Sequence, residues 1–173
     1  GIGKGMVTLE DFEKADAIFV IGQNPGTNHP RMLGDLRRAS VRGARVAVFN
    51  PVREKGLERF SDPQDKLEML TGGSKPIASE YYQVRVGGDM AAVRGMAKAV
   101  FTADDIARAD GRPSVLDHGF LRQHTTRLAA YRATVDATTW DDIEHQSGLS
   151  RVALERLAQI YIEADRSIVT WAM

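Results

Sequence analysis

The chain has 173 residues, 43% of them hydrophobic, and its 23 basic residues balance its 23 acidic residues. This length and composition predict one domain with a buried core. The neutral balance, without a basic stripe, argues against nucleic acid or an anionic membrane as a partner. The absence of cysteine excludes disulfides, thiolate metal sites, iron–sulfur ligation and a cysteine nucleophile within this chain. No apolar run approaches the ~20 residues that span a bilayer, and no signal peptide is recognisable, so we expect no membrane insertion and a cytoplasmic location.

The first predicted elements are a short helix and a strand. Thr8 and Asp11 form a capping box ahead of the helix. Residues 17–22 are apolar without alternation, which is typical of a parallel strand covered by helices on both faces. A loop rich in glycine, asparagine and proline follows at 22–30. Ligands of open α/β sheets bind at this end of a strand, so this loop is a candidate site.

The next elements complete a βαβ unit. Asn28 or His29 is expected to cap a helix that has Pro30 in its first turn and ends at Gly43. A second strand is predicted at 45–49, because residues 46–49 are again apolar on both faces. We expect this strand to lie beside the first, joined by a right-handed crossover.

The stretch 52–80 has weak periodicity, and we expect it to be mostly loop with one or two helical turns. Alternating residues predict a third strand at 82–86 that ends at Gly87 and Gly88. Asp89 then caps the next helix.

The remainder is helical until a last strand at 167–173. Helix starts are signalled at Asp117, Thr126, Thr139 and Ser150, and a stop at Gly148. The elements together predict an α/β fold, a Rossmann-like and mostly parallel sheet with helices on both faces, plus a helical segment near 116–164. Because a strand pattern stops at Met173 and the chain starts in a glycine-rich stretch, we expect both ends to be cut from a larger protein.

Four blocks, in this order and spacing, carry a family resemblance. They read GQNPGTNHPRML, VAVFNPVREKGLERF, VRVGGDMAAVRGMAKAVF and DHGFLRQHT…YIEADRSIVTWAM. They resemble one region of the molybdopterin oxidoreductases, closest to the catalytic (alpha) subunits of the formate dehydrogenase-like branch. The resemblance implies that residues 1–173 form one α/β domain, an internal fragment of such an electron-transferring subunit, which binds part of a bis(molybdopterin guanine dinucleotide) molybdenum cofactor. The parent protein is then an oxidoreductase, the remaining domains of its catalytic subunit are partners of this domain, and the isolated fragment is predicted to be inactive.

The resemblance also implies which residues contact the cofactor. The loop after the first strand lies against the pterin or phosphate portion, the end of the second strand runs beside the guanosine, and the turn before the long helix closes over the guanine nucleotide. The cofactor-binding residues carried over in this way are Gly22, Gln23, Asn24, Pro25, Asn50, Pro51, Gly87, Gly88 and Asp89. Backbone amides and a helix start suit phosphate, and a carboxylate suits the N1 and N2 donors of guanine.

No catalytic residue and no metal ligand is assigned to this chain. In the family the molybdenum ligand is a cysteine, selenocysteine or serine in another part of the parent, which also leaves room for an iron–sulfur cluster elsewhere. This chain departs from the wider pattern in two places. Val52 separates Pro51 from Arg53, which puts a phosphate role of that arginine in doubt, and Gly88 replaces the commoner threonine.

Other interpretations of the same residues remain open. Asp89 caps a helix with or without a ligand, and Asn24 can serve only as a residue that tolerates a left-handed turn. Trp140 and Trp171 are expected to be buried anchors. His118, His124 and His145 lack metal-ligand spacing and are assigned to packing or solvent. The alternative function is a stand-alone Rossmann-like domain that binds NAD or a flavin, although the loop GQNPG departs from GxGxxG. A purely structural interaction domain would leave the two asparagines and Asp89 without a use.

Overall fold

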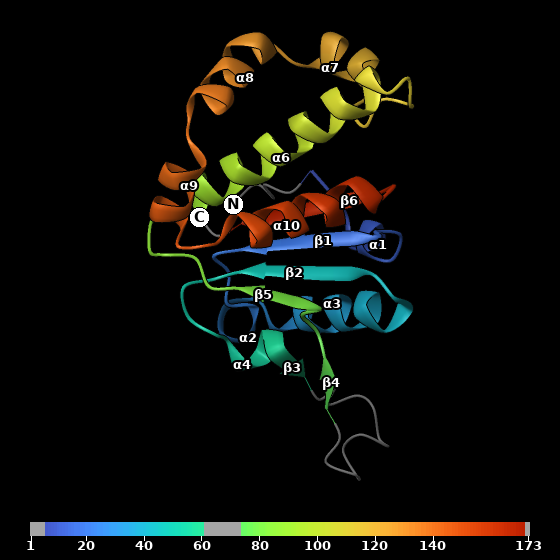
Figure 1. Ribbon diagram of the computed structural model, residues 1–173. Helices are drawn as coiled ribbons and strands as arrows, with labels where there is room; N and C mark the ends of the chain where they lie inside the picture. Colours follow the sequence, from blue (N-terminus) through green and yellow to red (C-terminus); the bar gives the residue numbers. More distant parts are fainter. Residues whose placement is uncertain (1–5, 61–73, 172–173) are drawn as a thin grey trace. The chain divides into compact units, whose positions relative to one another are not determined.

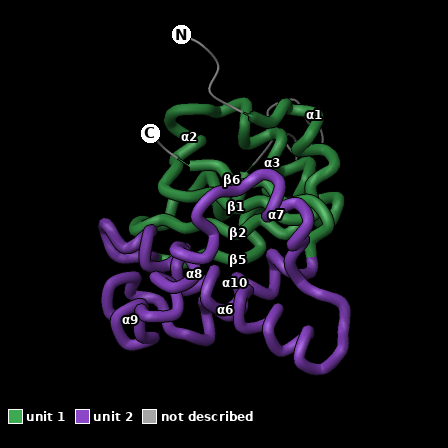
Figure 2. Tube along the Cα trace, turned by 90° about the horizontal axis from the view of Figure 1, so that it is seen from above, with its two compact units in different colours: residues 1–83, 164–173 green, residues 84–163 purple. Residues whose placement is uncertain are grey.

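The computed structural model describes residues 6–60 and 74–171, and it divides into two compact units (Figures 1 and 2). Unit 1 comprises residues 1–83 and 164–173, and unit 2 comprises residues 84–163. The expectation of one α/β domain over residues 1–173 stays a prediction. Within the described ranges, no helix combines the length and apolarity needed to cross a membrane.

Unit 1 is built on a parallel four-stranded sheet with the order β5–β2–β1–β6. Its strands are β1 (Ala17–Ile21), β2 (Arg45–Phe49), β5 (Glu80–Tyr82) and β6 (Ser167–Trp171). Ala17 lies opposite Arg45 on one side and opposite Ser167 on the other. The predicted α/β class with a parallel sheet is therefore confirmed, as are the strands predicted at 17–22, at 45–49 and from 167 onward. Residues 172–173 of the last predicted strand lie outside the described residues. Because all strands run in one direction, their carboxyl ends share one edge of the sheet.

The central strand β1 is buried on both faces, as its unbroken apolar run predicts. Ile18 and Val20 on one face, and Ala17 and Phe19 on the other, are at most 1% exposed. The helix α3 (Pro30–Arg42) runs along the sheet (Figure 1) and ends at Gly43 in the left-handed region, with φ 105°. The core cluster on this face comprises Phe12, Ala15, Ile18, Val20, Leu33, Leu36, Ala39, Ala44, Val46, Val48, Leu57, Ile77 and Ile168.

Short elements complete unit 1. They are α1 (Leu9–Phe12), α2 (Pro25–Asn28), α4 (Lys55–Glu58) and a hairpin of β3 (Arg59–Phe60) and β4 (Lys75–Pro76). The backbone N–H of Thr8 donates to Asp11 Oδ2 at 2.7 Å, as the predicted capping box requires. The sequence between residues 52 and 80 predicts helical turns, such as α4, but not the hairpin. Residues 61–73 of that stretch lie outside the described residues.

Unit 2 is helical, which confirms the helical segment predicted near 116–164. It contains α6 (Asp89–Ala109), α7 (His118–His124), α8 (Leu128–Ala137), α9 (Trp140–Ser147) and α10 (Arg151–Glu163). The long helix α6 contacts α8, α9 and α10. At Gly95 an added Cβ would lie 2.7 Å from Leu154 Cδ1 and 2.8 Å from Ile143 Cγ2, so glycine allows α9 and α10 to pack closely on α6.

Three predicted boundaries differ from the structure. The third strand is Glu80–Tyr82 and not 82–86, because Arg85 N–H donates to Ser147 O (2.8 Å) at the end of α9 and not to a neighbouring strand. Gly88, not Asp89, is the N-cap of α6, and no side chain caps that helix. The N-cap of α8 is Arg127, which has a φ of 58°, one residue after the predicted start at Thr126.

Candidate functional site

The loop after β1 leaves the carboxyl edge of the sheet in unit 1 through a left-handed glycine. Gly22 has a φ of 63°, and its N–H donates to Phe49 O at 2.8 Å, at the end of β2. A side chain at this φ would be strained, and nothing within 4 Å blocks the Cβ direction. The backbone is thus exposed at this point, as the sequence predicts for a loop that a ligand approaches.

Asn24 has a defined structural role in this loop. Its Oδ1 accepts a hydrogen bond from Thr27 N–H at 3.3 Å and so caps α2, whose first residue is the buried Pro25. The φ of Asn24 is −118°, so the interpretation that it occupies a left-handed turn is wrong. The helix α2 has no signal in the sequence, because four residues are too few to show a helical period.

Gln23 has one satisfied and one unsatisfied side-chain atom. Its Nε2 donates to Trp171 O at 3.2 Å, which connects the loop to the end of β6. Its Oε1 is buried and has no hydrogen-bond partner among the described residues. Leaving a buried acceptor unpaired costs about 1–3 kcal/mol, so such an atom calls for an explanation.

Asn50 joins the ends of the two central strands. It is 8% exposed. Its Nδ2 donates to Gln23 O at 3.1 Å, and its Oδ1 accepts from Val52 N–H at 3.3 Å. Pro51 follows it, and Pro51 O accepts from Gln83 Nε2 at 3.3 Å. The structure therefore brings together the six predicted residues of unit 1, and it gives Asn50 a role in fixing the loop.

Three further residues near this edge, Trp171, Gly26 and Gly56, were not predicted to belong to the site. Trp171, which was expected to be a buried anchor, is 63% exposed at the end of β6, so that expectation is wrong. A Cβ on Gly56 would lie 3.5 Å from Gly26 Cα, an ordinary contact distance, so α4 packs directly on α2 at these glycines. A single glycine in each of two short polar segments carried too little signal to predict this contact.

The other three predicted residues form the start of α6 in unit 2. Gly87 has a φ of 80°, and Gly88 N–H donates to Arg85 O at 2.8 Å. Asp89 is the first residue of the helix. Its Oδ1 is buried and, like Gln23 Oε1, has no hydrogen-bond partner in the described chain.

Asp89 also borders a hollow in the surface of unit 2. The hollow has a volume of about 260 Å³ and is lined by Asp89, Met90, Val93, Arg94 and Tyr131. A second hollow of about 210 Å³ in the same unit is bordered by Trp140 and Arg151. There Arg151 lies over the Trp140 ring at 5.0 Å and Nε donates to Glu155 at 2.7 Å, so its charge is already partnered.

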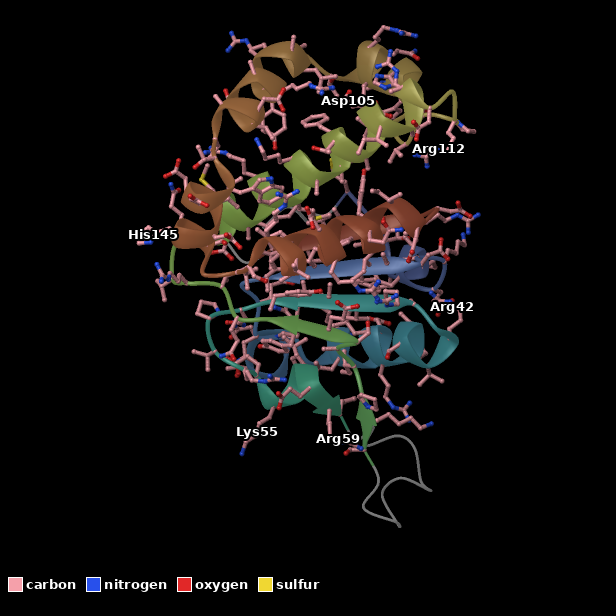
Figure 3. The ribbon with its side chains drawn as sticks, viewed as in Figure 1. Arg42, Lys55, Arg59, Asp105, Arg112 and His145 are labelled. Carbon is pink, nitrogen blue, oxygen red and sulfur yellow. The ribbon has the colours of Figure 1, made fainter. Side chains whose placement is uncertain are left out.

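The histidines do not form a metal site within the described ranges. His118 Nε2 lies 2.8 Å from Asp104 Oδ2, and the His124 ring packs on Phe120 with centroids 4.5 Å apart. His145 projects from α9, away from Asp105 on α6 (Figure 3). Among residues 6–60 and 74–171, no group of three or more His, Asp or Glu side chains is placed to hold a metal ion.

Comparisons with known proteins place the chain in a larger context. No family model matches it. It is 50% identical over 173 residues to the protein YdeP of Escherichia coli, covering 100% of this chain and 23% of YdeP. It is 41% identical over 173 residues to an uncharacterized oxidoreductase of Mycobacterium tuberculosis, covering 100% of this chain and 22% of that protein. Formate dehydrogenase H of Escherichia coli matches at 21% identity over 174 residues, which are 99% of this chain and 20% of the enzyme.

A solved structure shares the fold. The chain superposes on acetylene hydratase from Pelobacter acetylenicus with a TM-score of 0.67 and 19% identity, covering 91% of this chain and 18% of that one. At this identity the likeness concerns the fold. The chain spans less than a quarter of the length of each of these proteins.

Proposed function

We propose that this chain, a member of the molybdopterin oxidoreductase family in its formate dehydrogenase-like branch, binds part of bis(molybdopterin guanine dinucleotide). When bound, the cofactor supplies two-electron chemistry at its metal, on a small substrate such as formate. The residues of this chain bind and orient the cofactor, the metal ligand lies elsewhere in the parent protein, and the isolated chain is inactive.

One observation carries the proposal. Two buried side-chain oxygens, Gln23 Oε1 and Asp89 Oδ1, have no hydrogen-bond partner among the described residues, and both belong to residues that the family resemblance assigns to the cofactor. Both atoms are acceptors, and pterin and guanine present N–H donors. The residues therefore fit the group, because a bound ligand would satisfy atoms that the chain leaves unpaired.

In unit 1, exposed main chain and one side-chain amide would contact the cofactor. The left-handed Gly22 exposes main chain at the sheet edge, and Gln23 offers its free Oε1. Asn50 and Asn24 act here mainly as positioning residues, because both side chains already hold the loop in place. In unit 2 the contribution is the carboxylate of Asp89, which we assign to the N1 and N2 donors of guanine.

The rival NAD or flavin domain receives less support from the same residues. A Rossmann domain presents an acidic side chain to the ribose at the end of its second strand. Here that position is Asn50, whose amide is 8% exposed and hydrogen-bonded to Gln23 O and Val52 N–H. The loop after β1 also enters a four-residue helix, which is too short to present a helix N-terminus to phosphate.

The experiment is a calorimetric titration of the chain with GMP, AMP and NAD, repeated with the variant Asp89→Asn. We expect GMP to bind most tightly. The variant should bind GMP about 10- to 150-fold more weakly, because a charge-assisted hydrogen bond contributes about 1.5–3 kcal/mol. The affinity for AMP should change little, so the ratio of GMP affinity to AMP affinity should fall.

Asp141→Asn is the matched control. Asp141 is an exposed acidic residue in the first turn of α9 in the same unit, so its substitution makes the same change of charge beside a helix start. It should leave GMP binding unchanged. Tighter binding of NAD or AMP than of GMP by the unmodified chain would contradict the proposed function, as would an unchanged guanine preference in Asp89→Asn.

A further inference from the structure

The hollow beside Asp89 contains two residues that no motif of the sequence singled out. We propose that Arg94 and Tyr131 complete a site for a single purine base in unit 2, with Tyr131 as its stacking face and Arg94 as the donor to the acceptor edge of guanine. This inference rests on the proposed function, since it extends the guanine role of Asp89 to residues outside the GGD turn. All the lining residues belong to unit 2.

The size of the hollow suits one base. Its volume of about 260 Å³ lies just below the range of about 300–1,000 Å³ of pockets that enclose drug-sized ligands. A whole dinucleotide would not fit, whereas a planar bicyclic ring would. Met90 and Val93, which are 76% and 40% exposed, give the hollow an apolar lining on which such a ring can lie.

Tyr131 is held so that its ring can stack on a base. Its ring is 45% exposed and meets Phe101 edge to face, with the centroids 6.2 Å apart and an interplanar angle of 63°. Phe101 is itself buried, and Arg132 lies over its ring at 5.2 Å. The inner edge of Tyr131 is thereby fixed by packing, and part of its surface lines the hollow. Base stacking of this kind is tolerant of the base, so it supplies affinity more than selectivity.

Arg94 is a charged residue in the hollow whose charge is not paired within the described chain. It is partly buried, and its guanidinium makes no ion pair or hydrogen bond with any residue of the described ranges, Asp89 included. Arg132, by contrast, pairs with Asp105 and Asp136 on the neighbouring surface. A guanidinium matches the O6 and N7 acceptors of guanine with two parallel N–H donors.

The two charges together select guanine. Asp89 accepts from N1 and N2, and Arg94 donates to O6 and N7. Adenine reverses this pattern, because its N1 is an acceptor that would face the carboxylate and its N6 is a donor that would face the guanidinium. Inosine keeps O6, N7 and N1–H but lacks the N2 donor, so it should bind with intermediate affinity.

The test is a titration of the chain with guanosine, inosine and adenosine, followed by calorimetry and by the NMR shift of the guanosine H8 proton. Tyr131→Leu should weaken guanosine binding about 5- to 150-fold and remove the ring-current shift of H8. Tyr131→Phe is the matched control, because it keeps the ring and should keep both the affinity and the shift. Arg94→Met should weaken guanosine and inosine about equally and leave the weak adenosine binding unchanged.

Two outcomes separate this inference from the proposed function. Guanosine binding that depends on Asp89 but is unaffected by both Tyr131→Leu and Arg94→Met would overturn the inference alone. Absence of guanosine binding by the unmodified chain would overturn both. Circular dichroism checks that each variant is folded. If Tyr131→Leu does not fold, the H8 shift with Tyr131→Phe and the guanosine affinity of Arg94→Met still test the inference.

Discussion

Two carboxylates of helix α6 have different surroundings, Asp104 near its end and the candidate binding residue Asp89 at its start. Asp104 is fully buried, and its carboxylate accepts four hydrogen bonds. The donors are Ser114 Oγ at 2.5 Å, Val115 N–H at 2.9 Å, Leu116 N–H at 3.0 Å and His118 Nε2 at 2.8 Å. Asp89 Oδ1, by contrast, accepts no hydrogen bond from any residue that the structure describes. The contrast supports a role for Asp89 outside the packing of the unit.

The surroundings of Asp104 make the free energy of unfolding of unit 2 dependent on pH. Burial raises the pKa of this carboxyl, but the hydrogen bonds from Ser114, Leu116 and His118 outweigh that effect and lower the pKa to about 2. Because the folded pKa lies below the unfolded one, the stabilisation is complete above the unfolded pKa of about 4 and is lost as the pH falls toward 2. We expect this group alone to contribute about 2 kcal/mol near pH 6 and little near pH 2.

The measurement is the difference in urea unfolding free energy between the unmodified chain and Asp104→Asn from pH 6 to pH 2. The difference should be largest near pH 6 and shrink below pH 4. Asp105→Asn is the control, because the neighbouring Asp105 is exposed and should give a small difference throughout. A difference for Asp104→Asn that stays constant with pH would show that its carboxylate is not stabilised as described.

At the scale of elements, the turn before α6 is shaped by the end of α9. Arg85 holds the turn to α9 through its N–H, bonded to Ser147 O at 2.8 Å, and its Nη1, bonded to His145 O at 2.5 Å. A Cβ on Gly88 would lie 2.7 Å from Gln146 O and 3.0 Å from Ser147 Cα, both backbone atoms. This contact explains why a glycine occupies position 88.

Gly88→Ala should therefore destabilise the chain by about 1–3 kcal/mol, because backbone must shift to admit the methyl group. The matched control is Gly34→Ala in α3, where the nearest atom to the new Cβ is the side-chain Arg38 Nη1 at 3.6 Å. There the same change should stabilise by about 0.5–1 kcal/mol, since alanine favours a helix. Thermal unfolding compares the two variants, and equal stability of Gly88→Ala and the unmodified chain would refute the close contact.

The elements that the sequence predicts well are those with an unbroken apolar pattern. The strands β1, β2 and β6 and the helix α3 were placed within two residues of their bounds, because burial on both faces or along one stripe leaves a clear period. Val84 and Val86 alternate like a strand, but the turn binds α9, a partner more than 50 residues away. The alternation of apolar and polar residues alone could not distinguish a strand from a turn that packs on α9.

Some residues of the candidate site could likewise be predicted from the sequence, and others could not. The loop at 22–25 and Asn50 follow predicted strands, so their meeting at the sheet edge could be expected from the topology. Tyr131 lies on α8, and only the packing of α8 against α6 makes it a neighbour of Asp89 in the hollow. No local pattern carries that information.

At the scale of the whole molecule, the chain leaves unit 1 after residue 83 and returns to it at residue 164. The returning segment forms β6, which pairs with β1 in parallel from Ser167 to Trp171. Arg166 N–H donates to Asp16 Oδ2 at 3.0 Å at one end of the pair, and Gln23 Nε2 donates to Trp171 O at the other. Unit 1 therefore needs both distant segments to close its sheet and to hold the loop after β1.

This dependence can be tested on β6 with two neighbouring residues. Ile168 is 6% exposed and belongs to the core cluster, whereas Val169 is 45% exposed on the same strand. Ile168→Ala should cost about 2–5 kcal/mol, because it leaves a cavity between β6 and the rest of the core. Val169→Ala should cost less than about 1 kcal/mol. Since the chain has 2 tryptophans, one in each unit, a Trp140→Phe background allows urea unfolding of unit 1 to be followed by Trp171 fluorescence. Similar unfolding midpoints for the two β6 variants would mean that β6 is not integrated into the core of unit 1.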